Sequence, residues 1–197
     1  MSREPDDRPI RILFIGNSYT SRNHLPKLIE RIAHDTMGVS IETRSVVAGG
    51  ASLRRHWNAG EALALLQGSD WTHVVLQEQS TLPIKNPARF KENVRLFDHE
   101  IRQCGARTVL YLTWARQSAP DSQENLTKAV TEIAAELRAL VVPVGPAWQR
   151  AQQADPGIVL YEKDGSHPTP AGSRLAAEVF CATLFQEGST PRPARDA

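Results

Sequence analysis

The sequence has little cysteine and no long apolar run, and each absence excludes a class of protein. Its 197 residues contain only Cys104 and Cys181, each inside an apolar helical pattern, so neither a disulfide framework nor a zinc site is expected. No segment approaches the roughly 20 consecutive apolar residues that cross a bilayer. The first residues, MSREPDDRP, lack the apolar core of a signal peptide. We therefore expect a protein of a reduced, cytoplasmic compartment without membrane contact.

The sequence also lacks an excess of charge of either sign. It has 23 Lys and Arg against 22 Asp and Glu, which indicates no basic surface for a nucleic acid or a membrane. Its acidic and imidazole side chains do not show the spacing of a metal site. We expect no metal, no cofactor and no nucleic-acid partner, and the sequence does not predict an oligomeric state.

What the sequence does have is an alternation of strand-like and helix-like segments. Segments rich in Val, Ile, Leu or Thr predict strands at residues 10–15, 39–47, 73–76, 108–113 and 140–144. Apolar residues at helical spacing predict helices at residues 24–37, 51–67, 88–104, 122–138 and 170–185. This alternation favours the α/β class, with a parallel sheet covered by helices on both faces. We expect a single domain at residues 10–187, with disordered tails at residues 1–9 and 188–197.

Polar residues or glycines follow the first three predicted strands. Ser18 follows the first strand within GNSYTS, Gly49 and Gly50 follow the second, and Gln77 and Gln79 follow the third within QEQST. Ligands of an open parallel sheet bind beyond the carboxyl ends of the strands. These residues are therefore expected to lie together at one edge of the sheet.

A second informative segment, YEKDGSHPTPAG, precedes the last predicted helix. Its Asp164 and His167 lie three residues apart on a loop that Pro168 and Pro170 stiffen. A histidine in such a pair can present one ring nitrogen to a nucleophile while the carboxylate holds the other. Serine is a weak nucleophile that needs such a base. Taken alone, Asp164 and His167 are also explained as part of a solvated loop, and Ser18 alone as a helix cap. The presence of all three residues together favours nucleophilic catalysis.

In these segments the chain resembles the SGNH hydrolases, also called GDSL-like hydrolases, in the branch whose first block reads Gly-Asn-Ser. The resemblance extends from FIGNSYT to DGSHPTPAG. It implies a three-layer α/β/α fold whose five-stranded parallel sheet has the flavodoxin-like order 2-1-3-4-5. It also implies a serine esterase in which Ser18 is the nucleophile, His167 the general base and Asp164 its partner.

The resemblance also indicates which groups would bind the oxyanion. The backbone N–H groups of Ser18 and Gly50 are two donors, and Gly50 fits the family's second block better than Gly49. The third block departs from the family because VVLQEQST lacks the usual Asn. Gln77 is the first choice for the missing amide, as in some carbohydrate esterases of the superfamily, and Gln79 is the second. Alternatively, Gln77 only caps the strand and two donors remain.

Five further residues have predicted roles outside the catalytic set. Asn17 either hydrogen-bonds neighbouring loops or is a turn residue. His56 and Trp57 either line the substrate side of the site or belong to a helix face. Trp148, like Trp71, is expected to pack in or around the core.

The substrate is predicted only by class. The absence of a lid insertion favours a short acyl group, and the Gln-containing relatives suggest acetyl esters on carbohydrate. Two alternatives stay open: an acyltransferase or thioesterase that uses the same three residues, and a flavodoxin-like module that binds a phosphate or another ligand without catalysis. The binding module would have no use for Asp164 and His167.

Overall fold

The computed structural model describes residues 9–185, and within them five strands form one parallel sheet. The strands are β1 (Ile10–Gly16), β2 (Ile41–Val47), β3 (His73–Leu76), β4 (Arg107–Leu112) and β5 (Leu140–Pro143). They lie in the order β2-β1-β3-β4-β5, which confirms the predicted fold class. Residues 1–8 and 186–197, which include nearly all of the predicted tails, lie outside the described residues, so the domain limits stay a prediction.

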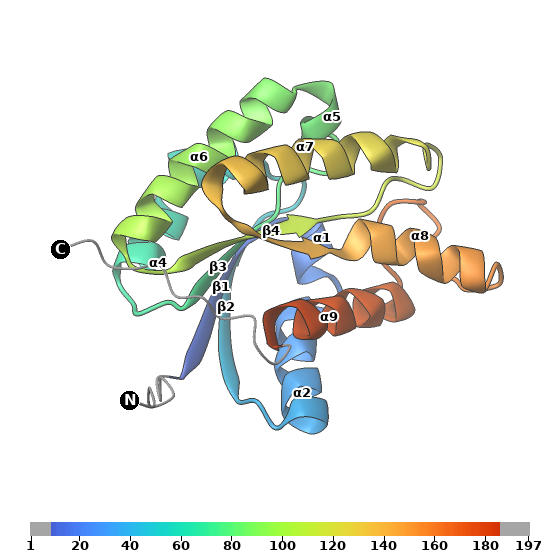
Figure 1. Cartoon of the computed structure of the whole chain (residues 1–197), viewed down its shortest axis with the longest axis horizontal. Helices are drawn as coiled ribbons and strands as arrows, with labels where there is room; N and C mark the ends of the chain where they lie inside the picture. The colour runs from blue at the N-terminus through green and yellow to red at the C-terminus, as the bar shows by residue number, and fades with distance from the viewer. Residues whose placement is uncertain (1–8, 186–197) are drawn as a thin grey trace.

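The central strands are apolar on both faces because helices cover both. In β1, Ile12 and Phe14 point to one face and Leu13 and Ile15 to the other, and all four are fully buried. The first face is covered by α2 (Leu25–Met37), α8 (Val144–Ala154) and α9 (Pro170–Phe185) (Figure 1). The second is covered by α3 (Leu53–Ala59), α4 (Glu61–Gln67), α6 (Pro87–Gln103) and α7 (Ser122–Leu137). The molecule therefore has the predicted three layers.

Several helices differ from those predicted. The sequence did not predict α8, nor the short elements α1 (Ser18–Ser21), η1 (Arg22–His24) and α5 (Leu82–Lys85). The single helix predicted at residues 51–67 is two helices, because Gly60 has a φ of 79° and ends α3 directly before α4 begins. A left-handed residue interrupts the helical ladder, and glycine adopts it without steric cost.

The strand order switches direction between β1 and β3. The connection from β1 to β2 runs through α2 on one face, while the connection from β2 to β3 runs through α3 and α4 on the other. Ligands of such sheets bind beyond the carboxyl ends of the strands at a switch point of this kind. Ser18 follows β1 and Gln77 follows β3 at this point.

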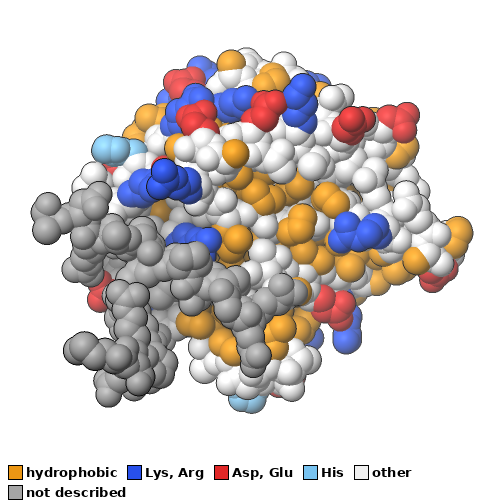
Figure 2. Space-filling view, viewed as in Figure 1, with side chains coloured by type: hydrophobic (Ala, Val, Ile, Leu, Met, Phe, Trp, Pro, Cys, Tyr) orange, Lys and Arg blue, Asp and Glu red, His pale blue; other side chains and the backbone are white. Residues whose placement is uncertain are grey.

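The surface carries interspersed charges of both signs, as the composition implies. Over α6 and α7, basic and acidic side chains alternate in Figure 2, and ion pairs join the two helices. Lys91 lies 2.7 Å from Glu132, and Arg95 lies 2.6 Å from Glu136. Among residues 9–185, no helix is both long enough and apolar enough to cross a membrane.

Candidate active site

The structure brings Ser18, His167 and Asp164 into one hydrogen-bonded series. Oγ of Ser18 lies 2.8 Å from Nε2 of His167, although the two residues are 149 positions apart in the chain. The other ring nitrogen of His167, Nδ1, is hydrogen-bonded to Oδ2 of Asp164. A base within hydrogen-bond reach of a serine, itself oriented by a carboxylate, is the arrangement that activates the hydroxyl for attack.

Asp164 is held in its orientation by the backbone of its own loop. Its Oδ1 accepts hydrogen bonds from the N–H groups of Ser166 and His167, each at 2.9 Å. The turn depends on Gly165, whose φ is 64°. The hydrogen bond from the His167 side chain, together with these two N–H groups, holds the pKa of Asp164 well below its usual range. Asp164, whose side chain is half exposed, is therefore ionised at neutral pH.

A stack of aromatic rings supports the loop that carries His167. Tyr19 stacks on Trp114 with ring centroids 4.8 Å apart, and Trp114 stacks on Trp148 at 4.0 Å. Nε1 of Trp114 donates to the carbonyl of Ser166 at 2.9 Å, and the Tyr19 hydroxyl lies 2.7 Å from Oγ of Ser166. The rings of Tyr19 and His167 also make a T-shaped contact, with their centroids 5.7 Å apart. The sequence did not predict this support, although Tyr19 directly follows Ser18.

Asn17 joins the Ser18 turn to the loop after β2. Its Oδ1 accepts from the N–H of Tyr19 and caps α1, while its Nδ2 donates to the carbonyl of Ala51 at 3.0 Å. The predicted bond between neighbouring loops is thus confirmed. Because α1 begins at Ser18, the N–H of Ser18 precedes the helical ladder, and no described residue accepts from it.

Gln77 lies beneath the Ser18 turn and not beside it. Its side chain is fully buried, and its Oε1 accepts from the N–H of Asn17 at 2.8 Å and from the hydroxyl of Thr20 at 3.0 Å. Its Nε2 donates to the carbonyl of Glu78. The backbone explains this position, since the N–H of Gln77 still pairs with the carbonyl of Ile15 and the residue continues the strand alternation. The Gln77 amide is thus buried, with partners on both its oxygen and its nitrogen, and this position does not favour it as the third donor.

Gly16 is required by the same contact. A Cβ on Gly16 would lie 2.6 Å from both Oε1 of Gln77 and Oγ1 of Thr20. Its carbonyl is also occupied, because Nε2 of His56 donates to it at 2.7 Å. The backbone of Gly16 therefore lies in direct contact with the side chains of Gln77, Thr20 and His56.

Gly50 lies in a tight turn of the loop after β2, the loop that Asn17 binds through the carbonyl of Ala51. The N–H of Ala51 donates to the carbonyl of Ala48, and Gly50, with a φ of 63°, is the third residue of that turn. A positive φ at this position is a feature of the type II turn and favours glycine. Gly50 is exposed, and no described residue accepts from its N–H.

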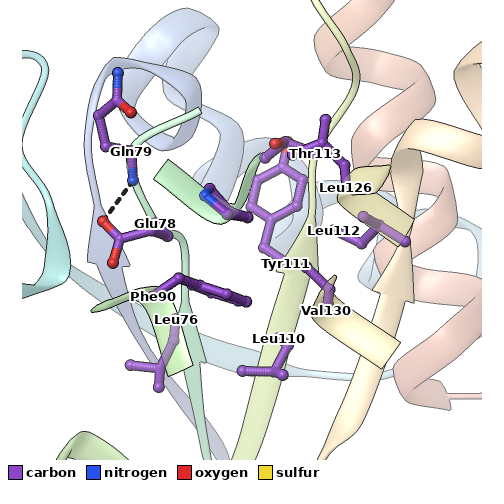
Figure 3. A pocket seen from close by; sticks show the side chains of 11 residues that line it. Leu76, Glu78, Gln79, Phe90, Leu110, Tyr111, Leu112, Thr113, Leu126 and Val130 are labelled. Carbon is purple, nitrogen blue, oxygen red and sulfur yellow. Dashed lines mark hydrogen bonds between the residues drawn. The ribbon is translucent and has the colours of Figure 1, made fainter. Parts of the chain in front are cut away.

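Gln79, unlike Gln77, is only partly buried. Its Oε1 accepts from the N–H groups of Thr81 and Leu82, at 2.9 Å and 3.0 Å. Within the described part of the chain, its Nε2 has no hydrogen-bond partner, and Figure 3 shows the amide pointing away from the cavity beneath it. Gln79 therefore retains two N–H donors at the carboxyl end of β3.

His56 and Trp57 belong to a helix face, the second of the two predicted alternatives. His56 is buried and bound to the Gly16 carbonyl, and Trp57 packs edge-on against Phe97 at 5.3 Å. Trp71 and Trp148 are buried, as predicted. Among residues 9–185, no group of three or more His, Cys, Asp or Glu side chains is placed to hold a metal ion.

Comparison with solved structures decides the family. A protein from Slackia heliotrinireducens, described as a candidate SGNH hydrolase, matches with a TM-score of 0.80 and 30% sequence identity over 90% of this chain and 100% of that chain. The chain belongs to the SGNH hydrolase family. The resemblance noted in the sequence is thereby confirmed, and with it the predicted class of enzyme.

More distant structures share the fold of this SGNH hydrolase. TesA matches with a TM-score of 0.67 and 20% identity, over 88% of this chain and 97% of its own. A variant of a Geobacillus acetyl-xylooligosaccharide esterase matches with a TM-score of 0.70 and 15% identity, over 90% and 95%. At these identities the likeness shows the fold alone. No protein-family model matches the chain, and no curated protein sequence matches it.

Proposed function

We propose that this SGNH hydrolase is a serine esterase that cleaves short-chain acyl esters through an acyl-serine intermediate. The observation that carries the proposal is the hydrogen-bonded series from Ser18 Oγ through both ring nitrogens of His167 to Asp164. In this proposal Ser18 is the nucleophile, His167 the general acid and base, and Asp164 the group that orients His167.

The proposed reaction has two steps with the same proton carrier. Oγ of Ser18 attacks the ester carbonyl carbon while Nε2 of His167 takes the hydroxyl proton. The tetrahedral oxyanion collapses, the bond to the alkoxy oxygen breaks, and that oxygen receives the proton from His167. Water then attacks the acyl-serine, again losing a proton to His167, and Ser18 is released with the carboxylic acid. Asp164 stabilises the imidazolium formed in each step.

Three donors are proposed for the oxyanion. Two are the backbone N–H groups of Ser18 and Gly50, which have no acceptor among the described residues. The third is Nε2 of Gln79, because Gln77 is fully buried and Gln79 is not. A donor of this kind lowers the barrier by about 3 kcal/mol.

Acetyl esters, with acetylated carbohydrate as the natural source, are the proposed substrates. Gln79 borders an apolar cavity of about 20 Å³ between the ends of β3 and β4, shown in Figure 3. Ser18, Gly50 and His167 do not line this cavity, and the Gln79 amide points away from it, so the short acyl group is proposed instead from the lack of a lid insertion in the sequence. One structure with the same fold is described as an acetyl-xylooligosaccharide esterase, which supports the carbohydrate source.

Hydrolysis of p-nitrophenyl acetate, butyrate and octanoate tests the activity and the acyl length together. We expect the highest kcat/KM with acetate and a loss of at least about 1000-fold in the Ser18→Ala variant. Ser21→Ala, in the exposed last position of the same short helix, is the matched control and should retain wild-type activity. Unchanged hydrolysis by Ser18→Ala would refute the proposed nucleophile, and a preference for octanoate would refute the short acyl group.

Release of acetate from acetylated xylo-oligosaccharides tests the carbohydrate source separately. We expect kcat/KM for the oligosaccharide to exceed that for ethyl acetate, because ring hydroxyls add contacts that a simple ester lacks. An enzyme that hydrolyses p-nitrophenyl acetate but releases no acetate from the oligosaccharide would remove the carbohydrate from the proposal and leave the esterase in place.

A further inference from the structure

Glu78 is a buried carboxylate that the proposed mechanism does not use. It follows Gln77 at the end of β3, and only 6% of its surface is exposed. Burial of a charged group costs several kcal/mol unless hydrogen bonds replace its water shell. The contacts of this side chain are therefore informative about what it does.

The carboxylate of Glu78 accepts three hydrogen bonds from three different segments. Its Oε1 accepts from the backbone N–H of Leu53 at 3.0 Å and from that of Gln79 at 2.7 Å. Its Oε2 accepts from Nδ2 of Asn93, in α6, at 2.9 Å. Figure 3 shows the bond to Gln79, with the carboxylate directed away from the cavity. All of these donors are fixed by the fold, since two belong to the backbone and Asn93 is itself buried.

The two backbone donors belong to the two segments that carry proposed oxyanion donors. Leu53 is the first residue of α3 and lies three positions after Gly50. Gln79 carries the proposed third donor on its own side chain. A single oxygen of Glu78 therefore fixes the separation between the Gly50 turn and Gln79, while Asn17 holds the same turn from the Ser18 side through Ala51.

The pKa of Glu78 lies above its usual value, because burial outweighs the hydrogen bonds that stabilise the carboxylate. Burial raises the pKa of Glu78, whereas the hydrogen bonds from Asn93, Gln79 and Leu53 act in the opposite direction. Behind Asn93, Nε of Arg54 donates to Oδ1 of Asn93 at 3.0 Å, which fixes the orientation of the Asn93 amide. Hydrogen bonds to a carboxylate are shorter and about twice as strong as those to a neutral oxygen, so this side chain holds both loops more rigidly than an amide would.

We propose that Glu78 is a positioning residue that sets the spacing of the Gly50 and Gln79 oxyanion donors without touching the substrate. This inference rests on the proposed esterase function. The donors of an oxyanion hole act only when they are already aimed at the developing charge, so a small displacement of either loop weakens binding of the transition state more than binding of the ester.

The Glu78→Gln variant tests the proposal through kcat and KM for p-nitrophenyl acetate. Gln keeps the shape but turns an N–H group toward Nδ2 of Asn93 and leaves a weaker acceptor for the two backbone N–H groups. We expect kcat to fall by about 10-fold to 100-fold. We expect KM to stay within about threefold of the wild-type value.

An exchange of the two partners provides the rescue. In Glu78→Gln/Asn93→Asp, the amide at position 78 donates to a carboxylate at position 93, and Arg54 then faces that carboxylate. The charge and the hydrogen bond between positions 78 and 93 are restored, while the two backbone N–H groups still face an amide oxygen, so we expect about half of the lost activity, on a logarithmic scale, to return. A residue that only stabilises the fold would show recovery of the melting temperature without this recovery of kcat.

Asp98→Asn is the matched control for removing a buried carboxylate. Asp98 is 4% exposed and accepts from Thr108 at 2.6 Å and from Arg102 at 2.7 Å, near the start of β4 and away from the site. We expect this variant to lose stability while its kcat at a fully folded temperature stays within about twofold of wild type. Should Glu78→Gln not fold, Asn93→Ala replaces it, with an expected fall in kcat of about threefold to tenfold.

The outcomes separate this inference from the proposed function. Wild-type activity that disappears in Ser18→Ala establishes the esterase. If Glu78→Gln, or Asn93→Ala in its place, then keeps wild-type kcat, or loses no more than Asp98→Asn does, the positioning role is overturned and the esterase stands. A double variant that regains stability but no kcat overturns it as well.

Discussion

Three buried polar side chains, Gln77, Glu78 and Gln123, hold the chain where β3 and β4 end. Beyond the end of a buried strand, the backbone N–H and C=O groups no longer pair with a neighbouring strand and need other hydrogen-bond partners. Gln77 and Glu78 supply them to the Ser18 turn and to the loops beside it. Gln123 does the same after β4, where its Oε1 accepts from the N–H of Ala115 at 2.7 Å and its Nε2 donates to the carbonyl of Thr113. The precision of the site thus depends on residues that do not face it.

The sequence offered two glutamines of one block for the third oxyanion donor and preferred Gln77, whereas the burial of Gln77 leads us to propose Gln79. QEQST has two amides, and the pattern does not show where the strand ladder stops. The structure shows that the N–H of Gln77 still pairs with Ile15, so that its side chain keeps to the buried face, whereas Gln79 lies beyond the ladder. The role of Glu78 was not predicted because its partners Leu53 and Asn93 are distant in the sequence.

Gln79→Glu tests the reassigned donor. The new carboxylate keeps an oxygen for the N–H groups of Thr81 and Leu82 but has no N–H to offer an oxyanion. We expect kcat for p-nitrophenyl acetate to fall by about 100-fold to 1000-fold, with the melting temperature close to that of wild type. Gln67→Glu, the same change at the exposed end of α4, controls for the added charge. A wild-type kcat in Gln79→Glu would contradict the role of Gln79 as third donor and would leave either Gln77 or an oxyanion hole with two donors.

At the scale of elements, the stack of Tyr19, Trp114 and Trp148 connects α1, the end of β4 and α8 to the His167 loop. The sequence did not predict α8 because VGPAW after β5 has the composition of a turn. Pro146 is nevertheless compatible with the first turn of a helix, where its missing N–H has no partner to lose. The contact between Trp148 and Trp114 depends on α8, so the stack could not be predicted from the sequence.

Trp114→Phe tests whether this stack orients His167. Phenylalanine keeps a ring between Tyr19 and Trp148 but loses the hydrogen bond to the carbonyl of Ser166. We expect kcat/KM to fall by about 10-fold to 100-fold, because small misplacements of a catalytic group are costly. Chemical denaturation should show a loss of about 1–3 kcal/mol in the free energy of unfolding.

Trp71→Phe is the matched control for that change. Trp71 is equally buried and donates to the carbonyl of Leu65 at 2.8 Å, away from the His167 loop. It should lose similar stability with little change in kcat/KM. Equal effects of the two substitutions on activity would mean that the stack only stabilises the fold.

At the scale of the whole molecule, the sequence predicted the layers and the strand order but not the distances. Buried strands covered on both faces leave a clear apolar pattern, as in β1 and β3, and the family blocks supplied the order. Ser18 and His167 lie 149 positions apart, so their contact depends on the assembled sheet edge and on the loop between α8 and α9. The blocks identified both residues, while the supports that bring them within 2.8 Å came only from the structure.

Labelling with a fluorophosphonate probe, followed by mapping of the modified peptide, tests the central claim most directly. Such a probe reacts with a serine hydroxyl that a base has activated and does not depend on the natural substrate. We expect one label, on Ser18, at a rate that falls by at least about 100-fold in His167→Ala. Absence of labelling, a label on another serine, or labelling of His167→Ala at the wild-type rate would contradict the account.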